Sequence, residues 1–176
     1  GAMDDGGGCV AAWEALRLIK ETGVRPKRTI RVVLWTNEEN GSKGGLEYHR
    51  WVKENEKSLD NHVLAIESDG GVFDPIGFGF TGSDVAYERL KEIGTILEPI
   101  ESGEVRKGGG GADIAPLMKD GVPGIGLIVE GEKYFWFHHT DADTIDKLDI
   151  EEFNQCVATM ATFAYGVADM EMRLPR

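Results

Sequence analysis

The most informative stretch of this sequence reads Ile30-Arg31-Val32-Val33-Leu34-Trp35-Thr36-Asn37-Glu38-Glu39-Asn40. Its apolar part, from Ile30 to Trp35, has the composition of a strand that is buried on both faces of a sheet. At its carboxyl end, such a strand delivers side chains to the rim of an open α/β sheet, where ligands usually bind. The stretch therefore predicts a ligand site that includes Glu38 and Glu39.

The two adjacent acids are expected to have different roles. Neighbouring residues of an extended segment point in opposite directions, so one glutamate can bind a metal ion while the other acts on water. The alternative is a solvated turn with two surface acids, which is the usual environment of glutamate. Other residues of metal-binding type fall where predicted strands end, and they favour the metal site.

A second buried strand is expected over Val63–Ile66, and it too ends in acids, Glu67-Ser68-Asp69. Between the two apolar runs, an amphipathic helix is expected from Leu46 to near Glu56. A strand, a helix and a strand of these lengths form a βαβ unit, which would make the two strands parallel neighbours. Their acidic ends would then lie at the same edge of the sheet.

Helix and strand patterns alternate along the remainder of the chain. Helices are expected over Val10–Ile19, Val85–Leu97 and Ala112–Lys119 and from Asp149 onward, and strands over Val122–Val129 and, as a short edge or hairpin strand, around Phe78 and Phe80. This pattern predicts an α/β fold, a three-layer α/β/α sandwich with a mostly parallel, mixed central sheet. A single domain is expected over residues 1–176.

Composition limits the classes of partner. The chain has 176 residues and a formal net charge of −12, which argues against nucleic acid and against an anionic membrane surface. No apolar run approaches the length of a transmembrane helix. The two cysteines, Cys9 and Cys156, lie in apolar helical patterns and are expected to be buried free thiols.

Two short patterns resemble known binding motifs, but the residues around or within each pattern do not meet the requirements of the motif. Gly77-x-Gly79-x-x-Gly82 matches the dinucleotide-binding fingerprint, but no strong buried strand leads directly into it. Asp141 and Asp143 begin a calcium-loop pattern, which Asp146 disrupts because it stands where that loop requires glycine.

Candidate metal ligands lie in turns or at strand ends rather than on helix faces. They are Asp4, Glu39, Asp69 and His139, with Glu38 beside them. Oxygen and imidazole ligands without a thiolate suit zinc, and carboxylates that can bridge suit a two-metal centre. The spacing alone is not specific, because similar sets could be chosen from many acidic proteins.

Four motifs in order add the specificity. They are residues 1–8 (Gly-Ala-Met-Asp-Asp-Gly-Gly-Gly), 35–41 (Trp-Thr-Asn-Glu-Glu-Asn-Gly), 67–71 (Glu-Ser-Asp-Gly-Gly) and 138–144 (His-His-Thr-Asp-Ala-Asp-Thr). Together they resemble the ordered motifs of the M28 family of zinc peptidases, and in particular its carboxypeptidase Q branch. The resemblance covers essentially the whole chain.

The resemblance implies a role for each candidate. Asp4 would bridge two zinc ions, Glu39 and His139 would complete the coordination of one, and Asp69 would bind the other. Glu38 would be the general base.

The resemblance also bears on three neighbouring features. Asp113 falls where the family has a further acid near the site, and its role is left open. His138 is expected to be structural, because the family motif places the ligand directly before Thr140. The family also implies a cis peptide bond between Asp4 and Asp5.

One departure from the family concerns completeness. The family's remaining ligand, a histidine upstream of the Asp4 turn, has no counterpart here, nor do the upstream strands and an inserted protease-associated domain. Gly1-Ala2-Met3 matches the family turn and is interpreted as native, although a tag remnant would read the same. We therefore expect these 176 residues alone to bind at most one zinc tightly and to hydrolyse peptides poorly.

The resemblance implies a co-catalytic zinc exopeptidase that acts on dipeptides or short peptides. Two other classes stay open: an inactive metal-binding fragment or pseudoenzyme, and an acyltransferase similar to glutaminyl cyclase. A secreted or extracytoplasmic location is a further expectation of the resemblance, whereas a homodimer is one of the oligomeric states that the sequence leaves open.

Overall fold

The computed structural model describes residues 1–55 and 59–176. The α-helices are α1 (Gly7–Glu21), α2 (Lys43–Asn55), α3 (Asp84–Gly94), α4 (Ala115–Lys119), α5 (Tyr134–Phe137) and α6 (Ile150–Asp169). The strands are β1 (Ala65–Glu67), β2 (Pro75–Thr81), β3 (Glu104–Lys107) and β4 (Gly124–Val129). Short helical turns are η1 (Ala2–Gly6), η2 (Glu38–Asn40), η3 (Leu59–Asn61), η4 (Thr95–Ile100) and η5 (Ile145–Lys147).

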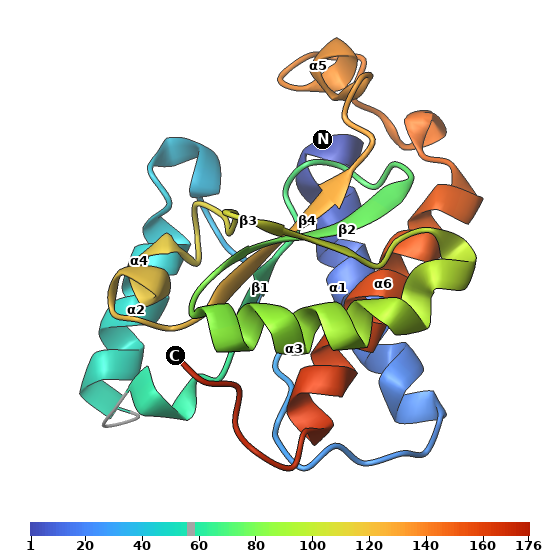
Figure 1. Cartoon of the computed structure of the whole chain (residues 1–176). Coiled ribbons are helices and arrows are strands. Elements are labelled where there is room, and N and C mark those ends of the chain that lie inside the picture. Colours follow the sequence, from blue (N-terminus) through green and yellow to red (C-terminus); the bar gives the residue numbers. More distant parts are fainter. Residues whose placement is uncertain (56–58) are drawn as a thin grey trace.

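The four strands form one mixed sheet in the order β1-β4-β2-β3. β1 is parallel to β4 and β2 is parallel to β3, whereas β2 and β4 are antiparallel, with Phe78 opposite Leu127. Figure 1 shows α1 and α6 on one side of the sheet and α2 and α4 on the other. The predicted α/β sandwich with a mostly parallel sheet is therefore confirmed.

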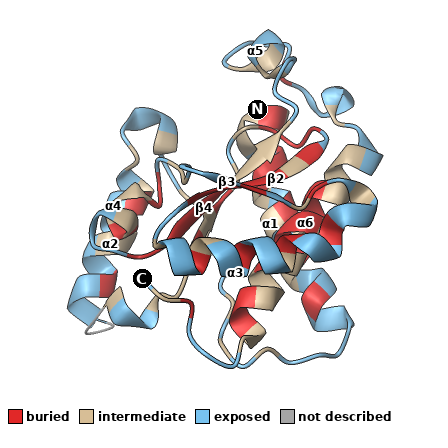
Figure 2. Cartoon of the chain, in the orientation of Figure 1, coloured by how far each residue is buried: buried red, intermediate tan, exposed pale blue. Residues whose placement is uncertain are grey.

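The core lies on both faces of the sheet. Toward α1 and α6, the fully buried Phe78 of β2 packs edge-on against Phe163 of α6, with ring centroids 4.7 Å apart. Toward α2 and α4, a smaller cluster contains Ala65, Ile114 and Leu117. Figure 2 shows buried residues concentrated on the strands and on the inward sides of α1 and α6.

The strand predicted over Ile30–Trp35 is not formed. The segment is extended, but residues 32–35 make no backbone–backbone hydrogen bond to any residue that the structure describes. Leu34 is 56% exposed. A strand exists only through its hydrogen-bonded neighbour, and no described segment pairs with this one. The predicted βαβ pair, with this segment and β1 as neighbours, is therefore wrong.

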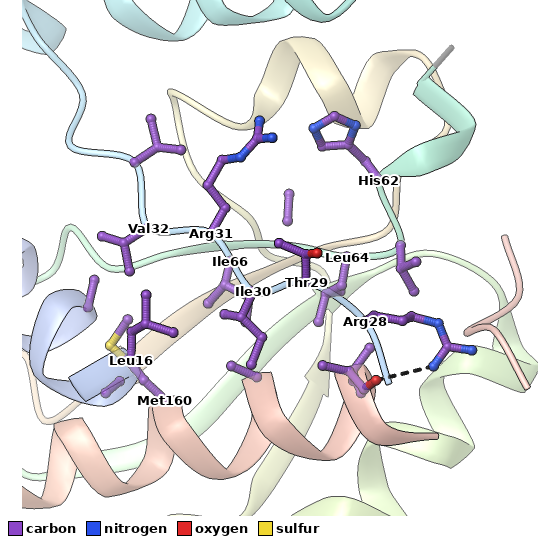
Figure 3. Close-up of a pocket in the computed structure, with 18 of the residues that line it drawn as sticks. Leu16, Arg28, Thr29, Ile30, Arg31, Val32, His62, Leu64, Ile66 and Met160 are labelled. Atoms are coloured by element: carbon purple, nitrogen blue, oxygen red, sulfur yellow. Dashed lines mark hydrogen bonds between the residues drawn. The ribbon is translucent and has the colours of Figure 1, made fainter. Parts of the chain in front are cut away.

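A cavity of about 630 Å³ separates this segment from β1. The cavity is partly open to solvent, and apolar side chains such as Ile30, Leu64 and Ile66 line much of it (Figure 3).

Three further expectations need correction. The strand around Phe78 and Phe80 is β2, which pairs on both sides and is not an edge strand. On α1, the predicted apolar face included Trp13, but Trp13 is 63% exposed and the buried face is built from smaller residues such as Ala11 and Ala15. Cys9 is only half-buried, whereas Cys156 is buried as expected. The predicted end of the helix near Glu56 lies outside the described residues.

Candidate metal centre

Asp4 lies in the turn that leads into α1, and its backbone departs from helical geometry, with φ −122° and ψ 91°. The peptide bond between Asp4 and Asp5 is cis, as predicted. Asp143 holds this turn: its Oδ1 accepts a hydrogen bond from the N–H of Met3 at 2.6 Å, and its Oδ2 accepts one from the N–H of Asp4 at 3.0 Å. The Asp4 carboxylate is thereby fixed next to the loop that carries both histidines.

His139 connects Asp4 to Glu39. Its Nε2 lies 3.3 Å from Asp4 Oδ2 and 2.9 Å from Glu39 Oε2. These are the three residues that were expected to hold one zinc ion. The Asp4 side chain is only 8% exposed, whereas Glu39 and His139 are about half exposed, so the group opens to solvent on one side.

His138 lies in the same cluster. Its Nε2 is 3.5 Å from Asp4 Oδ2, and its ring stacks on that of His139 with centroids 3.7 Å apart. Ligand atoms of Asp4, His138 and His139 all lie within 4.8 Å of one another, a spacing that allows them to hold a metal ion. The structure thus brings His138, which was expected to be structural, within reach of the site.

Glu38 and Glu39 occupy the turn η2, and both line a cavity beside β1. Glu39 contacts His139, as described above. Burial and then the charge of Glu38 raise the pKa of Asp69 and of Asp113, and the charge of Glu39 also raises the pKa of Asp69.

Asp69 follows β1 and lies outside the tight group around Asp4. Its backbone C=O accepts a hydrogen bond from the Tyr134 hydroxyl at 3.1 Å, which ties it to the loop of the histidines. It lines a cavity of about 400 Å³. Carboxylates from seven residues line this cavity, namely Asp4, Asp5, Glu38, Glu39, Glu67, Asp69 and Asp113.

Two of these acids are almost completely buried. Glu67 is 5% exposed and Asp113 is 4% exposed. Glu67 Oε2 accepts hydrogen bonds from the N–H groups of Asp113 and Ile114, at 3.1 and 2.9 Å. A Cβ atom at Gly111 would overlap the Glu67 carboxylate, so a larger residue there would have to displace this side chain. Glu67 Oε1 and Asp113 Oδ1 have no hydrogen-bond partner among the described residues.

The crowding of these acids favours their protonated forms when no cation is bound. Burial, assisted by the charge of Asp69, raises the pKa of Asp5 to about 8. Burial also raises the pKa of Glu67 to about 7 and that of Asp69 to about 6. A cation at the site would reverse this effect, because opposite charge stabilises a carboxylate.

The residues present fit zinc. Carboxylate and imidazole donors converge without a thiolate, and two buried carboxylate oxygens are left without partners among the described residues.

The sequence did not identify Asp5, Glu67 and Asp143 as residues of the site. Asp5 adjoins a predicted ligand and Glu67 follows an apolar run, but only the fold shows that they are buried. Asp143 lies in the motif of residues 138–144 and in the failed calcium-loop pattern, but neither pattern assigned it a role.

Comparisons with known proteins agree with this chemistry. A model described as Peptidase family M28 matches residues 1–164. Carboxypeptidase Q of Bos taurus is 48% identical over 176 residues, which is 100% of this chain and 37% of that protein. The chain therefore spans little more than a third of the length of this relative.

Solved structures show the same fold. A peptidase M28 precursor from Shewanella amazonensis superposes with a TM-score of 0.88 at 36% identity, over 100% of this chain and 39% of that one. BSAP, a zinc aminopeptidase from Bacillus subtilis, superposes with a TM-score of 0.74 at 20% identity. The superposition covers 99% of this chain and 44% of that one, and at this identity it shows the fold alone.

In the described part of the chain, no helix has both the length and the apolar character needed to cross a membrane.

Proposed function

Because this chain belongs to peptidase family M28, we propose that it carries most of the metal centre of a co-catalytic zinc exopeptidase that hydrolyses dipeptides or short peptides. The observation that carries the proposal is the group formed by Asp4, His139 and Glu39, with contacts of 3.3 and 2.9 Å. These side chains come from three segments far apart in the sequence and converge beside a cavity rich in carboxylates.

The ligand sets differ in completeness. Asp4, Glu39 and His139 would hold one zinc ion, with three protein ligands and an open position typical of a catalytic site. Asp4 and Asp69 would hold a second ion with only two ligands from this chain. When bound, zinc polarises a scissile carbonyl and lowers the pKa of a water molecule.

Glu38 is the proposed general base. It adjoins the proposed ligand Glu39, and its charge raises the pKa of Asp69 and Asp113, so it is close enough to the site to act beside the metal. Its carboxylate would accept a proton from the attacking water and donate it to the leaving amine. The carboxylates around it repel anions, which favours a substrate that presents an amide or an ammonium group to the cavity.

A substrate panel tests the reaction class. The zinc-loaded protein is assayed with free dipeptides, with N-blocked and C-blocked peptides, and with peptides that begin with glutamine. Release of amino acids from free peptides supports an exopeptidase, and the blocked peptides report which end is recognised. Formation of pyroglutamate without hydrolysis would indicate the acyltransferase instead. Zinc binding with neither product in a longer form of the polypeptide would indicate a pseudoenzyme.

Two further parts of the proposal concern the location and the assembly of the protein. We expect the protein to act outside the cytoplasm and to form a homodimer. Cell fractionation and sedimentation analysis of the protein as it is produced in its own cells test these two points.

A further inference from the structure

Tyr134 is the side chain that joins the loop of the two histidines to the segment after β1. It begins α5, and its hydroxyl donates a hydrogen bond to the backbone C=O of Asp69 at 3.1 Å. Figure 1 shows α5 on a loop that projects beyond the end of the sheet, near the amino terminus. The next two residues, Phe135 and Trp136, are 76% and 67% exposed. Of these three aromatic side chains, Tyr134 is the one that packs against the core.

The ring of Tyr134 is the first of three rings in contact. It lies against the ring of His138, with centroids 4.9 Å apart, and that ring stacks on His139 at 3.7 Å. The backbone C=O of Tyr134 also accepts a hydrogen bond from the N–H of His138 at 2.9 Å. The two ends of Tyr134 therefore meet the two ligand groups: the hydroxyl meets Asp69, and the ring supports His139 through His138.

His139 has a backbone conformation that needs such support. Its φ is +56°, in the left-handed region, which residues other than glycine seldom adopt unless the surrounding structure holds them there. Within the described residues, the other hydrogen bonds and ion pairs from residues 131–139 to distant segments end on Asp4 or Glu39. Both carry proposed ligand atoms, so the Tyr134 hydroxyl makes the one of these contacts that leaves the ligand atoms free.

The hydroxyl of Tyr134 remains a hydrogen-bond donor. Burial, followed by the charges of Asp4 and Asp69, raises the pKa of Tyr134, so the phenol keeps its proton. The backbone C=O of Asp69 is an acceptor that does not titrate. The hydrogen bond between them is therefore present whether the nearby carboxylates are charged or neutral.

We propose that Tyr134 is a positioning residue that sets the distance between the two ligand groups of the metal centre. Its hydroxyl holds the segment that follows β1, and its ring holds the stacked imidazoles of His138 and His139. Tyr134 acts through these residues, because partners that orient ligands reduce the cost of ordering them when a metal ion binds. The inference rests on the proposed metal centre and adds to it a residue that is not itself a ligand.

Cobalt(II) and zinc titrations of this chain test the role. Cobalt binds the same kinds of nitrogen and oxygen ligands as zinc, and its visible absorption reports the coordination geometry. Tyr134→Phe removes the hydroxyl and keeps the ring, so the affinity for both metals is expected to fall ~10–100-fold, with a changed cobalt spectrum. Tyr134→Leu also removes the ring contact with His138, so a further loss of affinity is expected.

Tyr87 provides a matched control. Its hydroxyl also donates to a backbone C=O, that of Val105 at 3.0 Å, but it belongs to α3 and does not line the metal cavity. Tyr87→Phe and Tyr134→Phe each lose one hydrogen bond of this kind, so urea unfolding of the metal-free chains should show similar losses of stability. Of these two variants, only Tyr134→Phe is expected to change the metal affinity and the cobalt spectrum.

Two results would contradict the inference in different ways. If the unsubstituted chain binds cobalt and both Tyr→Phe variants match it in affinity and spectrum, the positioning role is overturned and the proposed metal centre stands. If the unsubstituted chain binds neither cobalt nor zinc tightly, the proposed metal centre is overturned, and the positioning role with it.

Discussion

Asp143 anchors Asp4 through the backbone, although 139 residues separate them: its Oδ2 accepts the Asp4 N–H at 3.0 Å while its Oδ1 accepts the Met3 N–H at 2.6 Å. The same loop carries His138 and His139. One side chain thus fixes the relative positions of an acidic ligand and an imidazole ligand.

Removing this anchor should weaken zinc binding without removing a ligand. Asp143→Ala leaves two N–H groups without their acceptors, at a cost of ~1–3 kcal/mol for each buried group. Partners that orient ligands typically account for ~10–100-fold in metal affinity, so a loss of that size is expected in a zinc titration. Asp141→Ala, at an exposed position of the same loop, is the control. Equal zinc affinity in both variants would refute the anchoring role.

Glu38 and Glu39 should respond differently to the same change. In a longer, active form of the enzyme, Glu38→Gln should keep its zinc and lose turnover by the ~10²–10⁴-fold that general-base catalysis supplies. Glu39→Gln should lower zinc affinity, because it replaces a charged ligand that contacts His139. Metal content and kcat are measured on both. Equal metal loss in the two variants would contradict the division of roles.

His138 and His139 can be distinguished by keeping the ring and removing the nitrogens. His139→Phe should abolish tight zinc binding, since it removes the nitrogen that lies between Asp4 and Glu39. His138→Phe retains an aromatic ring to stack on His139, so if His138 acts by stacking, zinc affinity should fall less than about tenfold. A loss as large as that of His139→Phe would make His138 a ligand.

The metal-free chain should become less stable as pH rises. The folded-state pKa of Asp5 is about 8 and that of Glu67 about 7, both raised mainly by burial above ordinary values of 3.8 and 4.5. A group whose pKa is raised by folding stabilises the protein fully below its unfolded pKa and loses that contribution as pH passes its folded pKa. The free energy of unfolding in chelator should therefore fall between about pH 5 and 8.

Urea unfolding at a series of pH values measures this effect. Asp5→Asn keeps an oxygen that can accept the Gly8 N–H, as Asp5 does at 3.1 Å, and removes the titration, so it should flatten the decline. Saturating zinc should flatten it as well, since a bound cation stabilises the carboxylates. An unchanged slope in Asp5→Asn would rule out Asp5 as its source.

Local patterns in the sequence were sufficient for most of the fold. The apolar run of β4, the short β1 followed by acids, and the long helix α6 capped by Asp149 are all recognisable without tertiary information. The segment from Ile30 to Trp35 was not predicted correctly, because strand formation depends on a hydrogen-bonded neighbour, and no described segment pairs with residues 32–35.

The candidate site was predictable to the extent that its residues form motifs. Asp4, Glu39 and His139 were expected together and lie together, and Asp69 lines the cavity beside them. Asp143 and Glu67 also lie within the quoted motifs, but the motifs did not reveal their roles. Both act through backbone N–H groups from other segments, and only the folded chain shows which N–H groups an acid meets.

The zinc content of this chain tests the account most directly. The 176 residues are loaded with zinc, dialysed and analysed by mass spectrometry for metal, together with Asp4→Ala and a dipeptide assay. We predict about one tightly bound zinc per chain, held by the three ligands Asp4, Glu39 and His139, with its loss in Asp4→Ala and little turnover. Two tightly bound zinc ions with full turnover, or one zinc that survives Asp4→Ala, would contradict the account.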